Sequence, residues 1–516
     1  MKKGIIEKFS IVLILLFIAF VLSMKSGFNY FTKGGTNATD GDVFNCIGWL
    51  MKQGFVPYRD IFDHKGVFLY FLQYIGAFFG QYRGIYVVEV FFLTSSVFGC
   101  YIIAHKFSNK VTSIFVVLLV FARYSDCGYG NCVEEYSVLF QIIALYYFLD
   151  FFKNTKRYVI DNDGQIDNFA KENKWCDFRV LITGGCFACT FFMKANFCAI
   201  WIVFCIAIAI FCIQRKYWRT FIKFIISFFV GVLVVTVPII IYLLKNAAMQ
   251  DFIYDYFVFN RLYTSNGDRV TLKSLVNSVV VFSNTIPFIV SFLIMIFEIK
   301  RKDSYFVFNI IHLIFSITLL LLITMSGQIY SKMEIALLPA YIYPFSRLAR
   351  MLNSANWKKG QITMIVIGYF LVTFIYPSWS SLVNNAANDV SKYINSPASK
   401  GFHDNEIVKY IKEHTNEGDM ISVLGNQCRI YLYSNRLPNS KYIFLPDPRV
   451  DSSITKGYFE GLRNNSPEIL VISTKYSGKN AYIGDEIDAF LEEYEYELVL
   501  DGDTPVYQRL NAAKEK

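Results

Sequence analysis

Residues Phe221 to Leu244 read FIKFIISFFVGVLVVTVPIIIYLL, and Lys223 is the one charged residue among them. A helix needs about 20 mostly apolar residues to cross the roughly 30 Å hydrocarbon core of a bilayer. This stretch meets that length, and so do several others. The chain of 516 residues is 54% hydrophobic and 18% charged, whereas soluble domains carry about 25% charged residues. The sequence therefore predicts a multi-pass α-helical membrane protein.

The basic residues stand in short clusters between the apolar runs. One cluster holds Arg215, Lys216 and Arg219, and another holds Lys300, Arg301 and Lys302. Short basic loops mark the cytoplasmic side of a membrane protein. The net charge of +9 is therefore a topology signal, and it does not indicate binding to nucleic acid.

Alternation of these basic loops predicts about eleven transmembrane helices, with the N terminus in the cytoplasm. The predicted spans are 10–24, 84–104, 111–122, 136–152, 180–193, 197–213, 221–244, 275–297, 305–325, 335–345 and 362–376. Residues 25–83 are expected to form a large first external loop. Within it, Val67 to Phe79 is apolar but too short to span, so we expect it along the membrane interface. The chain is thus predicted to be a plasma (inner) membrane protein.

The composition changes near Ser380, where charged residues become frequent. We therefore divide the chain into a transmembrane domain, 1–379, and a small α/β domain, 380–516. An odd number of spans places this second domain on the extracytoplasmic side. Its predicted helices are 405–414 and 487–494, and its predicted strands are 420–424, 468–473, 497–500 and 505–509.

Charged residues that fall outside the cytoplasmic loops are the candidates for chemistry. By the predicted topology they share the outer face: Asp40, Asp42, Arg59, Asp60, Asp63, His64, Lys65, Glu134, Glu135 and Lys194. Carboxylates can accept a proton and cations can hold an anion, which is what a reactive site at that surface needs. The eleven cysteines show no metal-ligand spacing. Whether Cys127 and Cys132 form a disulfide stays open.

Each candidate also has a structural interpretation. Asp40 and Asp42 flank a glycine and are typical of a turn. Glu134 and Glu135 precede a helix, where acidic residues in the first turn are favourable. Lys194 could extend to the surface as a lysine at a helix end does. The run Asp63-His64-Lys65 adjoins an apolar interfacial helix, and charged groups at a membrane boundary favour a functional interpretation.

Four stretches resemble the bacterial GT-C glycosyltransferases related to protein mannosyltransferases and the aminoarabinose transferase. TDGDVFNCIGWLMKQGFVPYRDIFDHKGVFLYFL (39–72) resembles their first external loop, with its early acidic residue, its G-x-x-P-Y-R-D segment and its acidic-His-Lys-Gly turn. GNCVEEYSVLF (130–140) resembles their second acidic motif, and FFMKAN (191–196) resembles a helix that ends in a cation. VLGNQCRIYLYSNRLPNSKYIF (423–444) resembles the external domain of many Gram-positive members.

The resemblance implies an inverting transfer of sugar from a polyprenyl-phosphate donor to an extracytoplasmic acceptor, a cell-surface glycan or a lipid. Asp40 would be the catalytic base, with Asp42 the less strict match. Lys65 would hold the donor phosphate, supported by Arg59 and His64. The remaining residues would support the site, with Glu134 or Glu135 completing an acidic wall or assisting a divalent metal ion: Asp60, Asp63, Glu134, Glu135 and Lys194.

One segment departs from the family pattern. GQIYSKMEIALLP (327–339) carries Lys332 and Glu334 where relatives often carry a His-Tyr or similar polar pair, so it receives no role. Three alternatives remain: a secondary transporter, a polysaccharide polymerase or ligase, and a membrane scaffold. No internal repeat supports a transporter. A polymerase would usually lack the first-loop motif, and a scaffold would not need charges on one face.

Overall fold

The computed structural model describes residues 2–31, 40–127, 130–160, 177–265, 271–325, 327–354, 368, 374–395, 405–425, 427–445, 450–472 and 484–510. The chain divides into two compact units. The first comprises residues 1–25, 89–240 and 268–388, and the second comprises residues 26–88, 241–267 and 389–516. The predicted first external loop and the C-terminal segment therefore belong to one unit.

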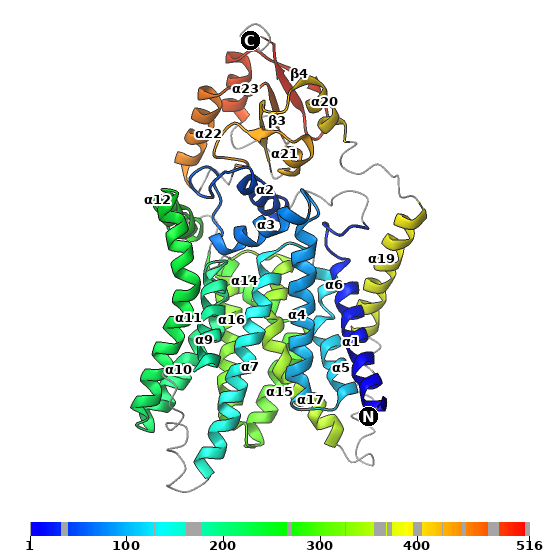
Figure 1. Cartoon of the computed structure of the whole chain (residues 1–516), viewed down its shortest axis with the longest axis vertical. Coiled ribbons are helices and arrows are strands. Elements are labelled where there is room, and N and C mark those ends of the chain that lie inside the picture. The colour runs from blue at the N-terminus through cyan, green and yellow to red at the C-terminus, as the bar shows by residue number, and fades with distance from the viewer. Residues whose placement is uncertain are drawn as a thin grey trace. The chain divides into compact units, whose positions relative to one another are not determined.

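The first unit is built of helices (Figure 1). They are α1 (Lys2–Ser23), α4 (Ile85–His105), α5 (Lys110–Phe121), α6 (Tyr124–Cys127), α7 (Val133–Ile160), α9 (Phe178–Phe191), η1 (Ala195–Phe197), α10 (Ala199–Gln214), α11 (Trp218–Lys245), α14 (Leu272–Ser283), α15 (Ile286–Lys300), α16 (Phe306–Thr324), η3 (Ser331–Leu337), α17 (Leu338–Ser354) and α19 (Tyr376–Asn395). Helix α7 packs on α9, α10 on α16, and α5 on α17. This arrangement confirms a multi-pass helical protein.

Five of the described helices are long and apolar enough to cross a membrane, judged by length and composition, and a bent pair makes a possible sixth. The sequence predicted about eleven spans. The segments expected at 111–122, 180–193 and 197–213 do form helices, but these have only 12, 14 and 16 residues. The last predicted span, 362–376, lies mostly outside the described residues.

The segment predicted as one span at 275–297 is instead two helices. Helix α14 ends at Ser283, α15 begins at Ile286, and the two are bent by 77°. Pro287 lies in the first turn of α15, where its missing N–H costs nothing, whereas inside a continuous helix it would remove a hydrogen bond. The continuous helix expected at 275–297 is therefore interrupted, because Pro287 favours the start of a new helix at this point.

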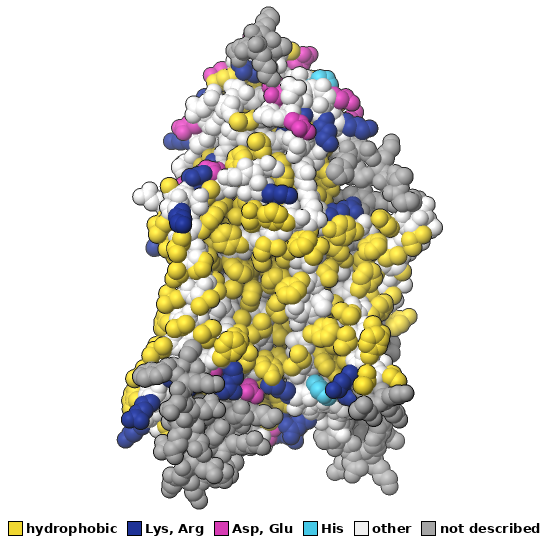
Figure 2. Space-filling view, viewed as in Figure 1, with side chains coloured by type: hydrophobic (Ala, Val, Ile, Leu, Met, Phe, Trp, Pro, Cys, Tyr) yellow, Lys and Arg dark blue, Asp and Glu magenta, His cyan; other side chains and the backbone are white. Residues whose placement is uncertain are grey.

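Helix α11 exposes large apolar side chains on its surface. Its side chains Phe229, Leu233 and Val234 are 58%, 52% and 61% exposed. Side chains this apolar are stable outside the protein core only in contact with lipid or another apolar partner. Hydrophobic side chains cover much of the visible surface of the helices in Figure 2, with Lys, Arg and His side chains gathered near their lower ends.

The second unit contains two helices from the predicted first loop, α2 (Asp40–Lys52) and α3 (Val67–Phe79). The predicted helix at Val67 to Phe79 is thus confirmed. Helices α2 and α3 pack closely: a Cβ atom at Gly48 would lie 2.4 Å from the carbonyl carbon of Gln73, so glycine is required there. The segment after α11 adds three short helices: α12 (Met249–Phe252), the π-helix η2 (Ile253–Phe259) and α13 (Asn260–Ser265).

The C-terminal part of this unit is a mixed five-stranded sheet with helices. Its strand order is β2-β1-β3-β5-β4, in which β1 is parallel to β2 and β3, and β5 is antiparallel to β3 and β4. The elements are α20 (Glu406–His414), β1 (Met420–Leu424), α21 (Arg429–Ser434), β2 (Leu437–Pro438), α22 (Ser452–Asn464), β3 (Ile469–Ile472), α23 (Gly484–Glu493), β4 (Tyr496–Leu500) and β5 (Val506–Arg509). The predicted strands and both predicted helices are confirmed, whereas α21, α22 and β2 were not predicted.

The beginning of the C-terminal segment also differs from the sequence reading. Helix α19 continues through Ser380, where the composition changes, and ends only at Asn395. The first polar residues after Ser380 therefore belong to a helix. The division between the two units falls after Asn388.

Candidate functional site

The Pro57-Tyr58-Arg59-Asp60 segment folds into a tight turn. The amide of Asp60 donates to the carbonyl of Val56 over 2.9 Å, and Oδ2 of Asp60 accepts from the amide of Val56 over 2.8 Å. Tyr58 has a positive φ of 71°, and its amide donates to the carbonyl of Ile61 over 2.8 Å. These bonds close the turn on itself and fix the direction in which the chain enters the next segment.

Arg59 forms a two-pronged pair with its neighbour. Its Nε donates to Oδ1 of Asp60 and its Nη2 to Oδ2, both over 2.8 Å, and its Nη1 donates to the carbonyl of Asn246 over 3.0 Å. Burial would raise the pKa of Asp60, but the hydrogen bonds from Arg59 and from the amide of Val56 outweigh it, so that pKa is lowered. The guanidinium of Arg59 is thus engaged within the turn.

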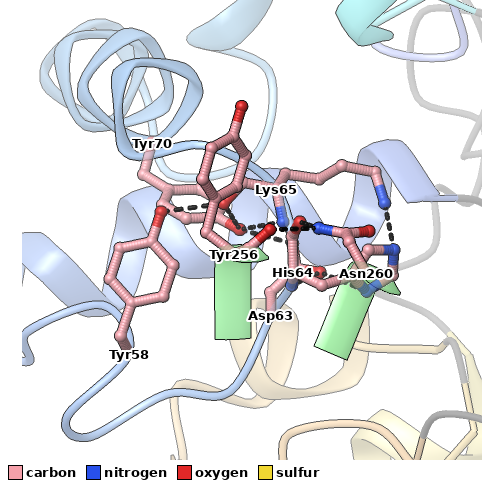
Figure 3. A network of polar contacts seen from close by, with 7 residues as sticks. All are labelled: Tyr58, Asp63, His64, Lys65, Tyr70, Tyr256 and Asn260. Atoms are coloured by element: carbon pink, nitrogen blue, oxygen red, sulfur yellow. Dashed lines mark hydrogen bonds and ion pairs between the residues drawn. The ribbon is translucent and has the colours of Figure 1, made fainter. Parts of the chain in front are cut away.

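The Asp63-His64-Lys65 run forms a second, buried turn (Figure 3). Oδ1 of Asp63 accepts from the amide of His64 over 2.7 Å, and its Oδ2 accepts from the hydroxyl of Tyr70 over 2.7 Å. The carbonyl of Lys65 accepts from the hydroxyl of Tyr58 over 2.8 Å, and Nζ of Lys65 lies beside Nε2 of His64. Two buried phenols from different segments therefore hold the turn that carries His64 and Lys65.

The surroundings of Asp63 shift the pKa of its carboxyl group. Only 3% of the residue is exposed. Burial raises its pKa, the charge of Asp40 raises it further, and Lys65 and the Tyr70 hydrogen bond lower it, with a raised pKa as the result. The structure thus holds the carboxylate of Asp63 beside His64 and under the influence of Lys65.

Asp40 and Asp42 lie in the first turn of α2, and not in the isolated turn that the flanking glycine suggested. Acidic residues at that position interact favourably with the helix dipole. Asp42 is 3% exposed and its Oδ1 accepts from the hydroxyl of Tyr82 over 3.1 Å. Asp40 is half-buried. The two carboxylates thus have different environments: Asp42 is built into the protein, whereas Asp40 keeps access to its surroundings.

The segment after α11 contributes contacts that the sequence did not predict. Nδ2 of Asn260 donates to the carbonyl of His64 over 2.7 Å and to the carbonyl of Tyr256 over 2.8 Å. The ring of Tyr263 stacks on the ring of His64, with centroids 5.8 Å apart. Figure 3 shows Asn260 and Tyr256 beside the turn. Asn260 and His64 are 196 positions apart in the chain, so no local pattern could have predicted this contact.

Glu134, Glu135 and Lys194 lie in the helical unit. Nζ of Lys194 pairs with Oε1 of Glu134 over 3.1 Å and lies 4.7 Å from the ring centre of Phe197. Glu134 is 2% exposed. Both glutamates lie in the first turn of α7, where they interact favourably with the helix dipole. Glu134 in addition has a specific cationic partner, Lys194. Lys194 in turn extends to Glu134 and not simply to the surface.

Further polar contacts surround this pair. Glu135 accepts a weak contact from Sγ of Cys132 over 3.8 Å, and the amide of Asn131 donates to the buried Glu89. Nε and Nη2 of Arg123 donate to the two carboxylate oxygens of Glu334 over 2.9 and 3.0 Å. Glu334 lies in the segment 327–339, which departs from the family pattern, and it forms an ion pair with Arg123. No sequence pattern indicated this pair.

No ligand set for a metal is formed by these groups. Among the residues that the structure describes, no three His, Cys, Asp or Glu side chains lie in an arrangement that could hold a metal ion. Glu134, for which the resemblance implies a place in an acidic wall or beside a metal, pairs with Lys194. The side chain of Cys127 lies outside the described residues, so the structure does not test whether Cys127 and Cys132 form a disulfide.

The fold of this chain is similar to that of two solved structures of ArnT. ArnT from Cupriavidus metallidurans bound to undecaprenyl phosphate matches with a TM-score of 0.61 and 12% identity, covering 99% of this chain and 98% of that chain. ArnT in the apo state matches with a TM-score of 0.60 and 11% identity, with the same coverage of 99% and 98%. The chain therefore has the fold of ArnT over its full length.

A third structure is more distant. The archaeal oligosaccharyltransferase AglB from Archaeoglobus fulgidus, in complex with an inhibitory peptide and a dolichol-phosphate, matches with a TM-score of 0.45 and 13% identity, over 96% of this chain and 74% of that chain. No protein-family model and no curated protein sequence matches this chain. The likeness to ArnT is thus a likeness of fold.

Proposed function

We propose that the protein is a membrane glycosyltransferase that moves a sugar from a polyprenyl-phosphate donor to an acceptor outside the cytoplasm, a cell-surface glycan or a lipid. The Asp63-His64-Lys65 turn carries the proposal: hydrogen bonds from Tyr58 and Tyr70 hold the backbone from which the Lys65 side chain extends, in a chain with the fold of ArnT. Groups held before the reaction stabilise developing charge without further reorganisation. The bilayer supplies the donor, and the protein is proposed to lie in the plasma (inner) membrane with its N terminus in the cytoplasm.

Lys65 is proposed to bind the donor phosphate. The leaving group is a polyprenyl phosphate, on which negative charge develops as the bond to the sugar breaks, and a fixed cation stabilises that charge. His64 lies beside the ammonium of Lys65 and is proposed to assist it. Arg59 is proposed as a supporting cation, and its pairing with Asp60 means that it would act through the shape and charge of its turn.

Asp40 is proposed as the general base that takes the proton of the acceptor hydroxyl as that oxygen attacks the sugar. A positioned carboxylate contributes a factor of about 10² to 10⁴ to the rate. Its half-buried position suits this role better than that of Asp42, whose carboxylate is buried and bonded to Tyr82. A single base and a direct displacement would invert the anomeric carbon.

The remaining candidates are proposed to support the site. Asp63 holds the backbone of the turn through the amide of His64, and Asp60 holds Arg59. Glu134, Glu135 and Lys194 are proposed as supporting acidic and polar residues of the helical unit, where the Glu134–Lys194 pair keeps a buried carboxylate charged.

The test is a transfer assay with the purified full-length protein in lipid vesicles. Radiolabelled polyprenyl-phosphate sugars would be supplied with extracted cell-surface glycans or lipids as acceptors. We expect the donor to be consumed and the label to appear in the acceptor, with Lys65→Ala as the inactive control. If the label crosses the bilayer while the donor stays intact, the protein is a transporter and the proposal is wrong.

A further inference from the structure

Lys441 lies in the C-terminal domain, and both its backbone and its side chain contact other segments of the same unit. Its carbonyl accepts a hydrogen bond from the amide of Phe62 over 2.8 Å, one residue before Asp63. Its ammonium pairs with Oδ1 of Asp251 over 2.8 Å and lies 4.0 Å from Oδ2 of Asp255. One residue therefore joins the C-terminal domain to the first loop and to the segment after α11.

Asp255 is the least satisfied member of this group. It lies on the π-helix η2 and is 1% exposed, and neither of its carboxylate oxygens accepts a hydrogen bond within the described part of the chain. A buried carboxylate without donors is costly to ionise. Burial raises the pKa of Asp255 to about 8, Lys441 lowers it, and Asp251 and Asp63 raise it. Short π-helical turns are frequent at functional sites.

Aromatic contacts hold the same part of the C-terminal domain against the turn. The ring of Phe62 lies 5.6 Å from that of Tyr442 and 6.3 Å from that of Phe444, measured between centroids. The hydroxyl of Tyr254 donates to Asp451, the residue that caps the start of α22. The 441–445 segment is thus packed against the residue that precedes the Asp63-His64-Lys65 turn.

We propose that Lys441 is a positioning residue, through which the C-terminal domain holds the Asp63-His64-Lys65 turn in place, with Asp251 as its charge partner and the buried Asp255 beside it. The positioning role itself does not need the proposed function; only its effect on sugar transfer rests on that function. The ammonium, paired with Asp251, keeps the carbonyl of Lys441 aligned with the amide of Phe62. Without that ammonium the contact loses its anchor, and Asp255 loses its nearest cation.

The proposal also predicts a dependence on pH. The titratable and charged groups that act on Asp255, or on which it acts, are Lys441, Asp251, Asp63, Tyr58, Tyr254 and Tyr442. When Asp255 ionises, a second buried negative charge appears near Asp63. This charge draws the ammonium of Lys441 from Asp251 toward Asp255 and so disturbs the contact between Lys441 and Phe62.

Hydrogen-exchange mass spectrometry on the full-length protein in lipid nanodiscs tests this without any substrate. In Lys441→Met, we expect peptides covering residues 62–65 to lose protection by about tenfold, because the local opening free energy falls by about 1.4 kcal/mol. Lys409→Met, which removes an exposed lysine of α20 in the same domain, should leave that protection unchanged, and Lys441→Arg should restore most of it. Wild-type protection in Lys441→Met would overturn the proposal.

A second variant covers the possibility that Lys441→Met fails to fold. Asp255→Asn removes the ionisation but keeps the side-chain shape. The protection factors of peptides 62–65 should fall between pH 7 and 9 in the wild type and stay level in Asp255→Asn; equal pH dependence in both would overturn the proposal. Transfer activity is measured in parallel. If protection responds as expected but the wild type transfers no sugar, the positioning role stands and the proposed function falls.

Discussion

The hydroxyl of Tyr70 donates a 2.7 Å hydrogen bond to Oδ2 of Asp63, and this bond ties the first turn of α3 to the turn that carries His64 and Lys65. Both partners are buried. Removing one partner of a buried hydrogen bond costs about 1–3 kcal/mol, because the other loses its solvation without compensation. The bond is therefore a sensitive point at which to test the geometry of the site.

Tyr70→Phe removes this donor and keeps the ring. We expect a lower unfolding temperature and a higher KM for the lipid-phosphate donor, since the loss amounts to about 1–3 kcal/mol. Thermal unfolding in detergent and transfer kinetics measure the two effects. Tyr74→Phe, on the same helix, is the matched control and should behave as wild type. Equal behaviour of both variants would show that the bond has no role in holding the turn.

Lys65→Ala should weaken donor binding, because the developing phosphate charge loses its fixed cation. Lys65→Arg should restore it only in part, since a planar fork differs in shape and reach from a point charge. Binding of a labelled polyprenyl phosphate to purified protein measures this directly, and Lys52→Ala serves as a control at the end of α2. Normal donor binding by a well-expressed Lys65→Ala protein would remove Lys65 from the phosphate site.

Asp40→Asn should lower transfer by about 10² or more while donor binding survives, because an amide cannot accept the acceptor's proton. Asp42→Asn should cost less, since an asparagine oxygen can still accept from Tyr82. The measurement is sugar transfer in membranes, with protein levels checked by blot. An inactive Asp42→Asn beside an active Asp40→Asn would assign the base to Asp42. If both variants transfer normally, the catalytic base lies elsewhere.

Asp255 should make the stability of the protein fall as pH rises. Its pKa in the folded protein, about 8, lies above the ordinary aspartate value of about 4. Stability from this group is therefore present at low pH and lost as pH rises toward 8, with no further loss above it. Unfolding temperatures of wild type and Asp255→Asn should agree near pH 4 and diverge by pH 8, with the variant more stable. Parallel curves across this range would contradict the assignment.

The orientation in the membrane has its own test. Single cysteines introduced near Asn131 and Lys456 should react with a membrane-impermeant maleimide in intact cells, and a cysteine near Arg301 should react only after the cells are permeabilised. This expectation rests on the basic loops, which are typical of the cytoplasmic side. Labelling of the Lys456 position only after permeabilisation would put the C-terminal domain in the cytoplasm and reverse the proposed topology.

Much of the fold was readable from local patterns. The helix at Val67–Phe79 and strands such as Met420–Leu424 formed where they were predicted, because long apolar runs and short apolar strands leave the backbone few ways to satisfy its hydrogen bonds. The break between α14 and α15 was missed although Pro287 signals it locally. The two-residue strand β2 is too short to leave a pattern.

The sequence by itself indicated which residues to propose for the chemistry, since Asp40 and the Asp63-His64-Lys65 run lie in one recognisable stretch, 39–72. Only the tertiary structure decided what holds them. Asn260 reaches the carbonyl of His64, and Lys441 reaches the amide of Phe62, across long separations in the chain. Contacts of this kind depend on how distant segments fold together, and no hydrophobic period or turn motif near either residue encodes its partner.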